Sequence, residues 1–201
     1  YGDNWESQFY GFEHKPLAAA SIGQVHRTLS PDGREIVLKV QYPGVAGSID
    51  ADVDNIASLL KISGLLPSEF DIAPLLDDAK AQLQDEADYN KEAEFLAAFG
   101  GLLAGDERFL VPEVLPELTC KTVLAMTYVS GQPIESIGAL PQVERDAVMT
   151  ALIELMFREL FELRMVQTDP NFANYQYDRS SGKIVLLDFG ATRRFKASFV
   201  N

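Results

Sequence analysis

Residues 167–190 carry the most informative pattern in the chain, QTDPNFANYQYDRSSGKIVLLDFG. Asn174 follows Asp169 by five positions, and Asp188 follows Asp169 by nineteen, directly after the apolar run 184–187. Two turns would bring these three oxygen-bearing side chains together, and carboxylate and amide oxygens are the ligands that Mg²⁺ prefers. The alternative is a turn in which Asp and Asn only cap the local backbone.

The spacing is typical of a phosphoryl-transfer site. In a kinase catalytic loop one Asp faces the attacking hydroxyl, while an Asn and the Asp of Asp-Phe-Gly hold metal ions that bridge the phosphates. We therefore predict that Asp169 is a catalytic residue and that Asn174 and Asp188 bind Mg²⁺ or Mn²⁺. The expected nucleotide is ATP.

Such a site also needs a loop over the phosphates and a lysine. The frame G-x-G-x-x-G-x-V is matched, with alanines at the first two glycine positions, by Ala18, Ala20, Gly23 and Val25. Lys39 lies fourteen residues after Val25, in the next strand-like run, where the phosphate-pairing lysine is expected. The predicted nucleotide-binding residues are Ala18, Ala19, Ala20, Ser21, Gly23, Val25 and Lys39. We expect the alanines to restrict the loop because alanine disfavours a positive φ; alternatively, they pack a short strand.

The lysine requires a carboxylate partner from a helix of the first lobe. Glu86, Asp88 and Glu92 are candidates in one predicted helix. Asp88 and Glu92 are four residues apart and would share a helix face, with Glu86 pointing elsewhere. Spacing alone does not choose among them, and a solvated charged face is the alternative.

Hydrophobic periodicity and turn residues predict an α+β fold with two lobes. We expect strands at 17–42, 111–114, 122–129, 175–177 and 184–190, and helices at 48–66, 72–103 and 141–165. Residues 1–130 would form a first lobe with an antiparallel sheet and inserted helices. Residues 131–201 would form the first part of a mostly helical second lobe. The aromatic segment 1–16 is interpreted as a packed lead-in, with a membrane-touching amphipathic segment as the alternative.

Composition excludes some classes of protein. The formal net charge is −13, which argues against a nucleic-acid binder because phosphate backbones require clustered Lys and Arg. Cys120 is the only cysteine, so no intrachain disulfide is expected. No apolar run approaches the roughly 20 residues that span a bilayer. The chain begins at Tyr1, and we expect an upstream segment to be missing.

Together these motifs resemble the UbiB, or aarF-domain-containing, family of atypical kinases, within a protein-kinase-like fold. The matching segments are residues 16–26 (PLAAASIGQVH), 39–45 (KVQYPGV), 86–93 (EADYNKEA), 167–174 (QTDPNFAN) and 187–193 (LDFGATR). The form Gln-Thr-Asp-Pro-Asn is most similar to the mitochondrial and alphaproteobacterial branch linked to coenzyme Q biosynthesis.

The resemblance implies specific roles. Glu92 would be the ion-pair partner of Lys39, and Glu86 with Asp88 would form a regulatory Glu-x-Asp motif. In the family that motif engages an N-terminal Lys-x-Gly-Gln element, which we expect to precede this chain, as we expect the remainder of the second lobe to follow it. Implied partners are quinone precursors, an acidic lipid surface and coenzyme Q biosynthesis proteins. The implied location is the bacterial cytoplasm at the membrane, or the matrix face of the mitochondrial inner membrane.

Two departures from ordinary protein kinases bear on the reaction. Gln167 and Thr168 replace the His and Arg that usually precede the catalytic Asp, and no Ala-Pro-Glu segment follows Asp188. These features favour small-molecule or lipid-linked phosphotransfer, or ATP hydrolysis, over peptide phosphorylation. A small-molecule kinase of the aminoglycoside-phosphotransferase type and a nucleotide-binding scaffold with little turnover are the other hypotheses.

Overall fold

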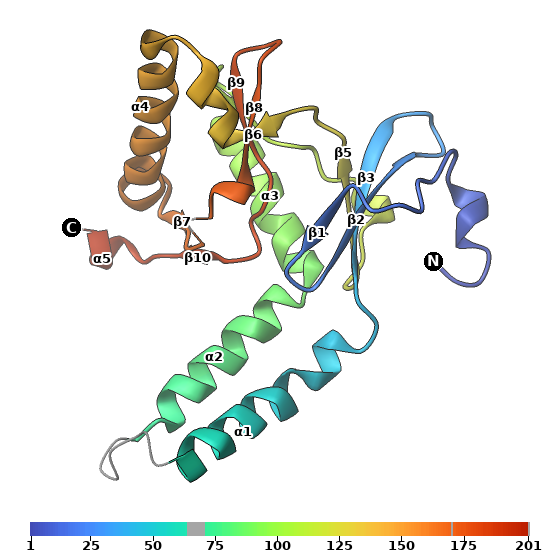
Figure 1. The fold of residues 1–201 in the computed structure, drawn as a ribbon, viewed down its shortest axis with the longest axis vertical. Helices are drawn as coiled ribbons and strands as arrows, with labels where there is room; N and C mark the ends of the chain where they lie inside the picture. Colours follow the sequence, from blue (N-terminus) through green and yellow to red (C-terminus); the bar gives the residue numbers. More distant parts are fainter. Residues whose placement is uncertain (64–70, 170, 201) are drawn as a thin grey trace.

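A computed structural model describes residues 1–63, 71–169 and 171–200, and it has two lobes (Figure 1). The first lobe is built on a four-stranded antiparallel sheet in the order β1-β2-β3-β5. Its strands are β1 (Ala18–Ala20), β2 (Gly23–Leu29), β3 (Glu35–Gln41) and β5 (Val123–Thr127). The predicted hairpin at 17–42 therefore consists of three strands, with turns at Ser21–Ile22 and at 30–34.

Strand β3 explains how the sheet is covered on both faces, because alternate side chains point to opposite sides. Ile36 and Leu38 pack with Phe9 and the loop before β5 on one face. Val37 packs on the other face with helix α3 (Tyr89–Leu103). Lys39 lies two residues after Val37, so the pleat directs it toward α3.

The N-terminal segment covers the outer face of the sheet. A 3-10 turn spans Trp5–Gln8, and Phe9 is buried. Trp5 and Phe12 pack edge-on with their ring centroids 4.7 Å apart, and both contact the cluster around Phe9. The packed lead-in predicted for 1–16 is confirmed for this aromatic group.

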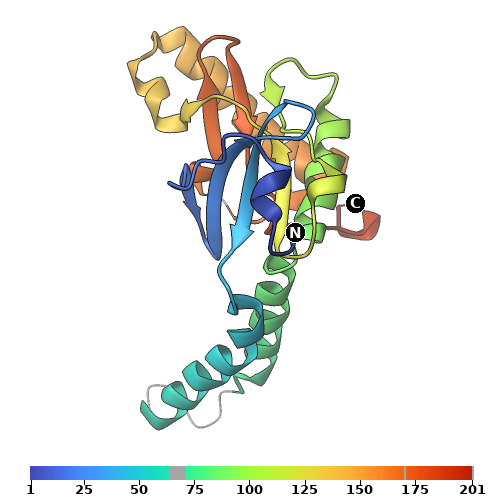
Figure 2. The ribbon, with the colours of Figure 1, turned by 90° about the vertical axis from the view of Figure 1, so that its right-hand side faces the viewer.

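Two helices project from the first lobe as an antiparallel pair, α1 (Val45–Ser63) and α2 (Ala73–Glu86) (Figures 1 and 2). Lys80 Nζ lies 2.6 Å from Asp54 Oδ1 and ties α2 to α1. The helix expected at 48–66 begins earlier, and residues 64–66 lie outside the described part of the chain. None of the described helices is long and apolar enough to cross a membrane.

The single helix predicted at 72–103 is wrong, because the chain breaks between α2 and α3. Asp88 has an extended backbone (φ −112°, ψ 94°), and its side chain accepts the amide of Asn90. An Asp that caps a new helix competes with continuation of the old one. Gly100 and Gly101, in contrast, lie inside α3 and do not end it.

The second lobe contains a four-stranded sheet in the order β4-β9-β8-β6. Its strands are β4 (Phe109–Leu110), β9 (Lys183–Leu186), β8 (Tyr175–Asp178) and β6 (Gln132–Pro133). The strand expected at 111–114 is wrong: β4 precedes it and pairs in parallel with β9, and only Val114 makes an isolated bridge, to Met126. Pro112 has no amide hydrogen to donate to a ladder. The division of the chain at residue 130 stays a prediction. Strand β4 departs from this division, because it lies before residue 130 and yet pairs with β9 of the second lobe.

Helix α4 (Gln142–Arg158) flanks this sheet, and its last part differs from the predicted helix 141–165. Residues Glu159–Leu163 form a π-helical turn, and Arg164 adopts the left-handed conformation (φ 52°). The chain then reverses into β7 (Met165–Gln167), which pairs with β10 (Thr192–Arg194). A short helix, α5 (Ala197–Val200), follows.

We predict that Gly23→Ala is destabilising. A Cβ atom at this position would lie 2.2 Å from the Val40 carbonyl oxygen, so β2 and β3 would have to separate. Overpacking of this kind costs about 1–3 kcal/mol. Urea unfolding curves, fitted with a common m-value, measure the change in the free energy of unfolding. Gly47→Ala in α1 is the matched control, since nothing lies within 4 Å of its added Cβ and alanine favours a helix. Equal midpoints for the two variants would contradict the tight β2–β3 packing.

Candidate active site

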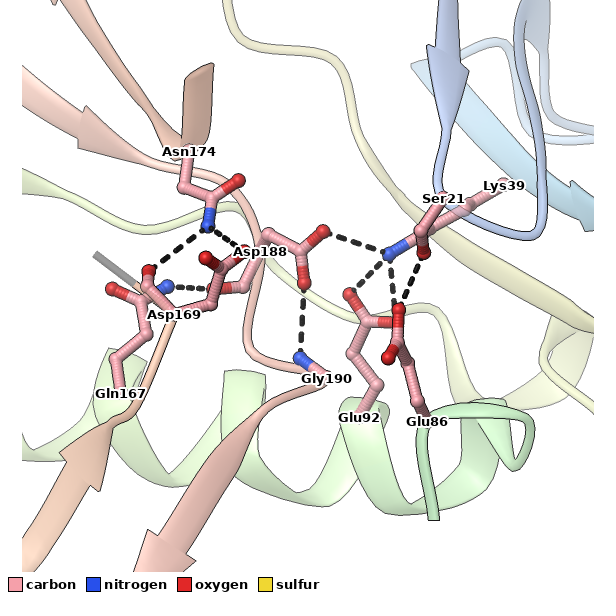
Figure 3. A network of polar contacts seen from close by, with 9 residues as sticks. All are labelled: Ser21, Lys39, Glu86, Glu92, Gln167, Asp169, Asn174, Asp188 and Gly190. Atoms are coloured by element: carbon pink, nitrogen blue, oxygen red, sulfur yellow. Dashed lines mark hydrogen bonds and ion pairs between the residues drawn. The ribbon is translucent and has the colours of Figure 1, made fainter. Parts of the chain in front are cut away.

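Lys39 is the centre of a buried ion network. Its Nζ lies 2.8 Å from Glu92 Oε1 and 2.9 Å from Glu92 Oε2, on α3, and 3.2 Å from Asp188 Oδ2 (Figure 3). Lys39 is 6% exposed and Glu92 is 2% exposed. The network thus joins three segments that are distant in the sequence: β3, α3 and the turn after β9.

The opposite charges in this network offset the energetic cost of burying them. Burial lowers the pKa of Lys39, but Glu92 and Asp188 more than reverse this, so the net shift of its pKa is upward and Lys39 is a cation. Burial raises the pKa of Glu92 to about 7, an effect that the neighbouring Lys39 opposes. Removing one partner of such a pair would leave an uncompensated buried charge.

Asp169 and Asn174, the predicted catalytic-loop residues, lie on the opposite side of the site (Figure 3). Asn174 is buried, and its Nδ2 donates to Asp169 Oδ2 at 3.2 Å and to the Asp169 carbonyl at 3.4 Å. This leaves the Asn174 Oδ1 as a ligand atom for a metal. Asp169 itself is exposed, so a nucleophile can reach its carboxylate. The local-capping alternative applies to Asn171, whose side chain accepts the Ala173 amide; Pro170 lies outside the described residues.

Asp188 is held from two directions. Its Oδ1 accepts the Gly190 amide at 3.0 Å, while Oδ2 faces Lys39. Sequence reasoning missed the contribution of Gln167, which donates through Nε2 to the Asp188 carbonyl (Figure 3). Gln167 also accepts the hydroxyl of Tyr175 at 2.9 Å. The available signal was a side-chain amide, able to donate and accept, two residues before Asp169.

A cavity of about 600 Å³ opens between the lobes, and most of the predicted site residues line it. Lys39, Asp169, Asn174 and Asp188 line one part, and Met126 with the segment that joins the lobes lines another. The residues of the alanine-rich segment that line it are Ala18, Ala19, Ala20, Ser21 and Val25. Carboxylate and amide oxygens beside a buried ammonium suit a metal–nucleotide complex.

Three predicted site residues do not line the cavity. Gly23 is buried and packs against Val40, Glu92 lies behind Lys39, and Asp88 caps α3. The expectation that Asp88 and Glu92 share a helix face is wrong, because Asp88 stands before the first residue of α3. The alanines at 18–20 lie in strand β1, and Arg164 is the only described non-glycine residue with a positive φ.

Glu86 faces the cavity, contrary to the expectation that it points elsewhere. It accepts a hydrogen bond of 2.5 Å from Ser21 Oγ, which lies at the turn after β1 (Figure 3). The break at residues 87–88 allows this, because it ends α2 with Glu86 beside that turn. Glu86, Glu92 and Asp188 all lie within 4 Å of a Cβ built on Gly190, so the region is rich in negative charge.

Comparison with known protein families shows to which family this chain belongs. A model of the ABC1 atypical kinase-like domain matches residues 1–201. The chain belongs to this family. The family resemblance and the kinase-like α+β fold predicted from the sequence motifs are confirmed.

Members of the ABC1 family with curated names are similar over the whole chain. The chain is 43% identical over 200 residues to "Atypical kinase COQ8B, mitochondrial" of Danio rerio, covering 100% of this chain and 32% of that relative. It is 40% identical over 199 residues to "Atypical kinase COQ8, mitochondrial" of Saccharomyces cerevisiae, covering 99% and 40%. The chain therefore spans well under half the length of these relatives.

Solved structures agree on the fold. The structure of the Rv3197–erythromycin complex from Mycobacterium tuberculosis has a TM-score of 0.81 and 30% identity, covering 96% of this chain and 49% of that one. The Rio2 kinase–ADP/Mg²⁺-phosphoaspartate complex from Chaetomium thermophilum has a TM-score of 0.57 and 14% identity, covering 96% and 51%. The second likeness bears on the fold alone.

We predict that Lys39→Met makes the stability of this ABC1 domain strongly dependent on pH. Without Lys39, burial raises the pKa of Glu92 against the Phe189 backbone hydrogen bond alone, and the folded-state pKa of Glu92 rises further above the unfolded value of about 4.3. A raised folded-state pKa gives stability that is present at low pH and is lost as the pH rises through that pKa. The free energy of unfolding should therefore fall between about pH 5 and pH 8, and its fall should continue above pH 7, where that of wild type levels off, by about 1.4 kcal/mol per unit of additional pKa shift.

Urea unfolding at several pH values in this range measures the effect. Lys91→Met is the control, because Lys91 pairs with Asp85 at an exposed position. Parallel pH profiles for wild type and Lys39→Met would show that Glu92 does not depend on Lys39.

Proposed function

We propose that this chain binds ATP with Mg²⁺ or Mn²⁺ and moves its γ-phosphoryl group to water or to a small-molecule or lipid-linked acceptor. The observation that carries the proposal is that Lys39, held from behind by Glu92, lines one cavity together with Asp188 and the Asp169–Asn174 pair. Kinase-type names among the relatives support the reaction class.

Each side chain has a role that its surroundings suit. Lys39, fixed by Glu92, would pair with phosphate oxygens, and Asp188 with the Asn174 Oδ1 would hold the metal. When bound, the metal neutralises charge on the phosphates. Asp169 would orient the attacking hydroxyl, since its carboxylate is exposed and is held from behind by the Asn174 Nδ2. The acidic surroundings of Lys39 make a divalent ion necessary for bringing in a triphosphate.

The proposed biological setting is coenzyme Q biosynthesis. It rests on the motif resemblance to that branch and on relatives named COQ8 and mitochondrial. Quinone precursors, acidic lipid surfaces and proteins of that biosynthesis are the proposed partners. The matrix face of the mitochondrial inner membrane and the bacterial cytoplasm at the membrane are the proposed locations. A regulatory scaffold that binds nucleotide with little turnover is the competing function.

The metal assignment predicts that nucleotide binding needs a divalent ion. Asp188→Asn should weaken Mg²⁺-dependent ATP affinity by about tenfold or more, because a charged hard ligand is lost. Calorimetric titration of ATP with and without Mg²⁺ measures this for wild type and variant. Asp146→Asn, at an exposed position on α4, is the control. Equal ATP affinities with and without the ion would remove the metal from the proposal.

The catalytic assignment predicts that Asp169→Asn separates binding from turnover. The amide keeps the shape of the side chain and removes the charge that orients the nucleophile. Turnover should fall by about 10²-fold or more while ATP affinity changes little, because the interaction acts mainly in the transition state.

Phosphate release measures turnover, with and without phenolic quinone precursors and acidic-lipid vesicles. An Asp169→Asn variant that hydrolyses ATP at the wild-type rate would rule out Asp169 as the orienting group. Tight ATP binding by a wild-type protein with no turnover under any of these conditions would favour the scaffold.

A further inference from the structure

Glu159 is a buried carboxylate that the proposed reaction does not use. It is 4% exposed, and its Oε2 accepts the backbone amide of Gln167 at 2.9 Å. Burial raises the pKa of Glu159 to about 7, an effect that the Gln167 amide opposes. Among the described residues no Lys or Arg forms an ion pair with it. Burying a carboxylic acid with so little hydrogen bonding is energetically costly, so the contact with Gln167 calls for a functional explanation.

The local backbone is shaped to bring Glu159 to Gln167. Glu159 begins the π-helical turn at the end of α4, and Arg164 in the left-handed conformation reverses the chain into β7. A non-glycine residue at positive φ is strained and persists where its surroundings require it. Strand β7 pairs with β10 along one edge only, so the Gln167 amide on its other edge needs an acceptor.

Gln167 in turn connects the two halves of the reacting centre. Its side chain donates to the Asp188 carbonyl and accepts from Tyr175 Oη, and Asp169 follows it by two residues. Tyr175, from β8, is the titratable side chain that interacts with Glu159. Burial first, and then the charges of Glu159 and Asp169, raise the pKa of Tyr175 to about 12, so its hydroxyl stays a donor near neutral pH.

We propose that Glu159 is a positioning residue: by fixing the Gln167 backbone, it sets the place of the catalytic Asp169 and, through the Gln167 side chain, that of the metal-binding Asp188. The roles of Asp169 and Asp188 rest on the proposed function. The anchoring of Gln167 does not, because it can be measured without nucleotide.

The test compares Glu159→Leu, which removes the acceptor, with Glu159→Gln, which keeps a neutral acceptor of similar shape. Glu162→Gln is the control, because Glu162 lies in the same turn and is exposed, paired with Arg158. For each protein we would measure the hydrogen-exchange rate of the Gln167 amide without nucleotide, the Kd for Mg²⁺–ATP, kcat and Tm.

In Glu159→Leu, Gln167 exchange should accelerate and kcat should fall, each by about tenfold or more, the size expected for a lost hydrogen bond to a charged group. The Kd for Mg²⁺–ATP should rise by less than kcat falls, because Glu159 reaches the metal-binding Asp188 only through the Gln167 side chain, and Glu159→Gln should restore most of kcat. If the wild-type protein shows no turnover, the exchange rate of the Gln167 amide still tests whether Glu159 anchors Gln167. Failure of the proposed function is therefore distinguished from failure of this proposal.

If Glu159→Leu does not fold, the pH dependence of Gln167 protection replaces it. Protection should rise with pH through about 7 in wild type, as the carboxylate ionises into a stronger acceptor, and should be flat in Glu159→Gln. Unchanged Gln167 exchange in Glu159→Leu, identical pH profiles in wild type and Glu159→Gln, or a Glu159→Gln variant as impaired in kcat as Glu159→Leu, would overturn the proposal.

Discussion

The burial of one positive charge constrains this domain more than any other single feature. Lys39 lies in the middle of β3, and a lone buried ammonium would be strongly unfavourable. Glu92 from α3 and Asp188 from the turn after β9 compensate it together. The two ion pairs of Lys39 therefore fix α3 against the first sheet and bring the second lobe to the same point. The fold and the site are held by the same contacts.

The break between α2 and α3 is the second determinant of the site. It lets Asp88 cap α3, so that Glu92 lies in the first turn of that helix, close to Lys39. It also ends α2 with Glu86 beside Ser21, so the turn of the alanine-rich segment is held by a side chain from a distant helix. One short irregularity thus positions both acidic groups on the α3 side of the cavity.

The sequence was informative where the chemistry is local and periodic. The period of two in β3 predicts that Lys39 shares a face with Val37, and the motif spacing placed Asp169, Asn174 and Asp188 in two turns. It could not show that Asp88 begins a helix instead of continuing one, because its capping bond competes with helix propensity by a small margin. The pairing of β4 with β9 and the contacts of Glu159 and Gln167 depend on tertiary packing, which leaves no periodic signal.

In the site that we propose, Asn174 and the segment 188–190 surround a metal–nucleotide complex beside Lys39. Paramagnetic broadening by Mn²⁺ tests it most directly, with the protein labelled for NMR and Mn²⁺ added alone or with ATP. We expect the resonances of the Asn174 side-chain amide and the Gly190 backbone amide to broaden first, and only when both Mn²⁺ and ATP are present. Broadening that ignores ATP, or that centres away from these two groups, would contradict it.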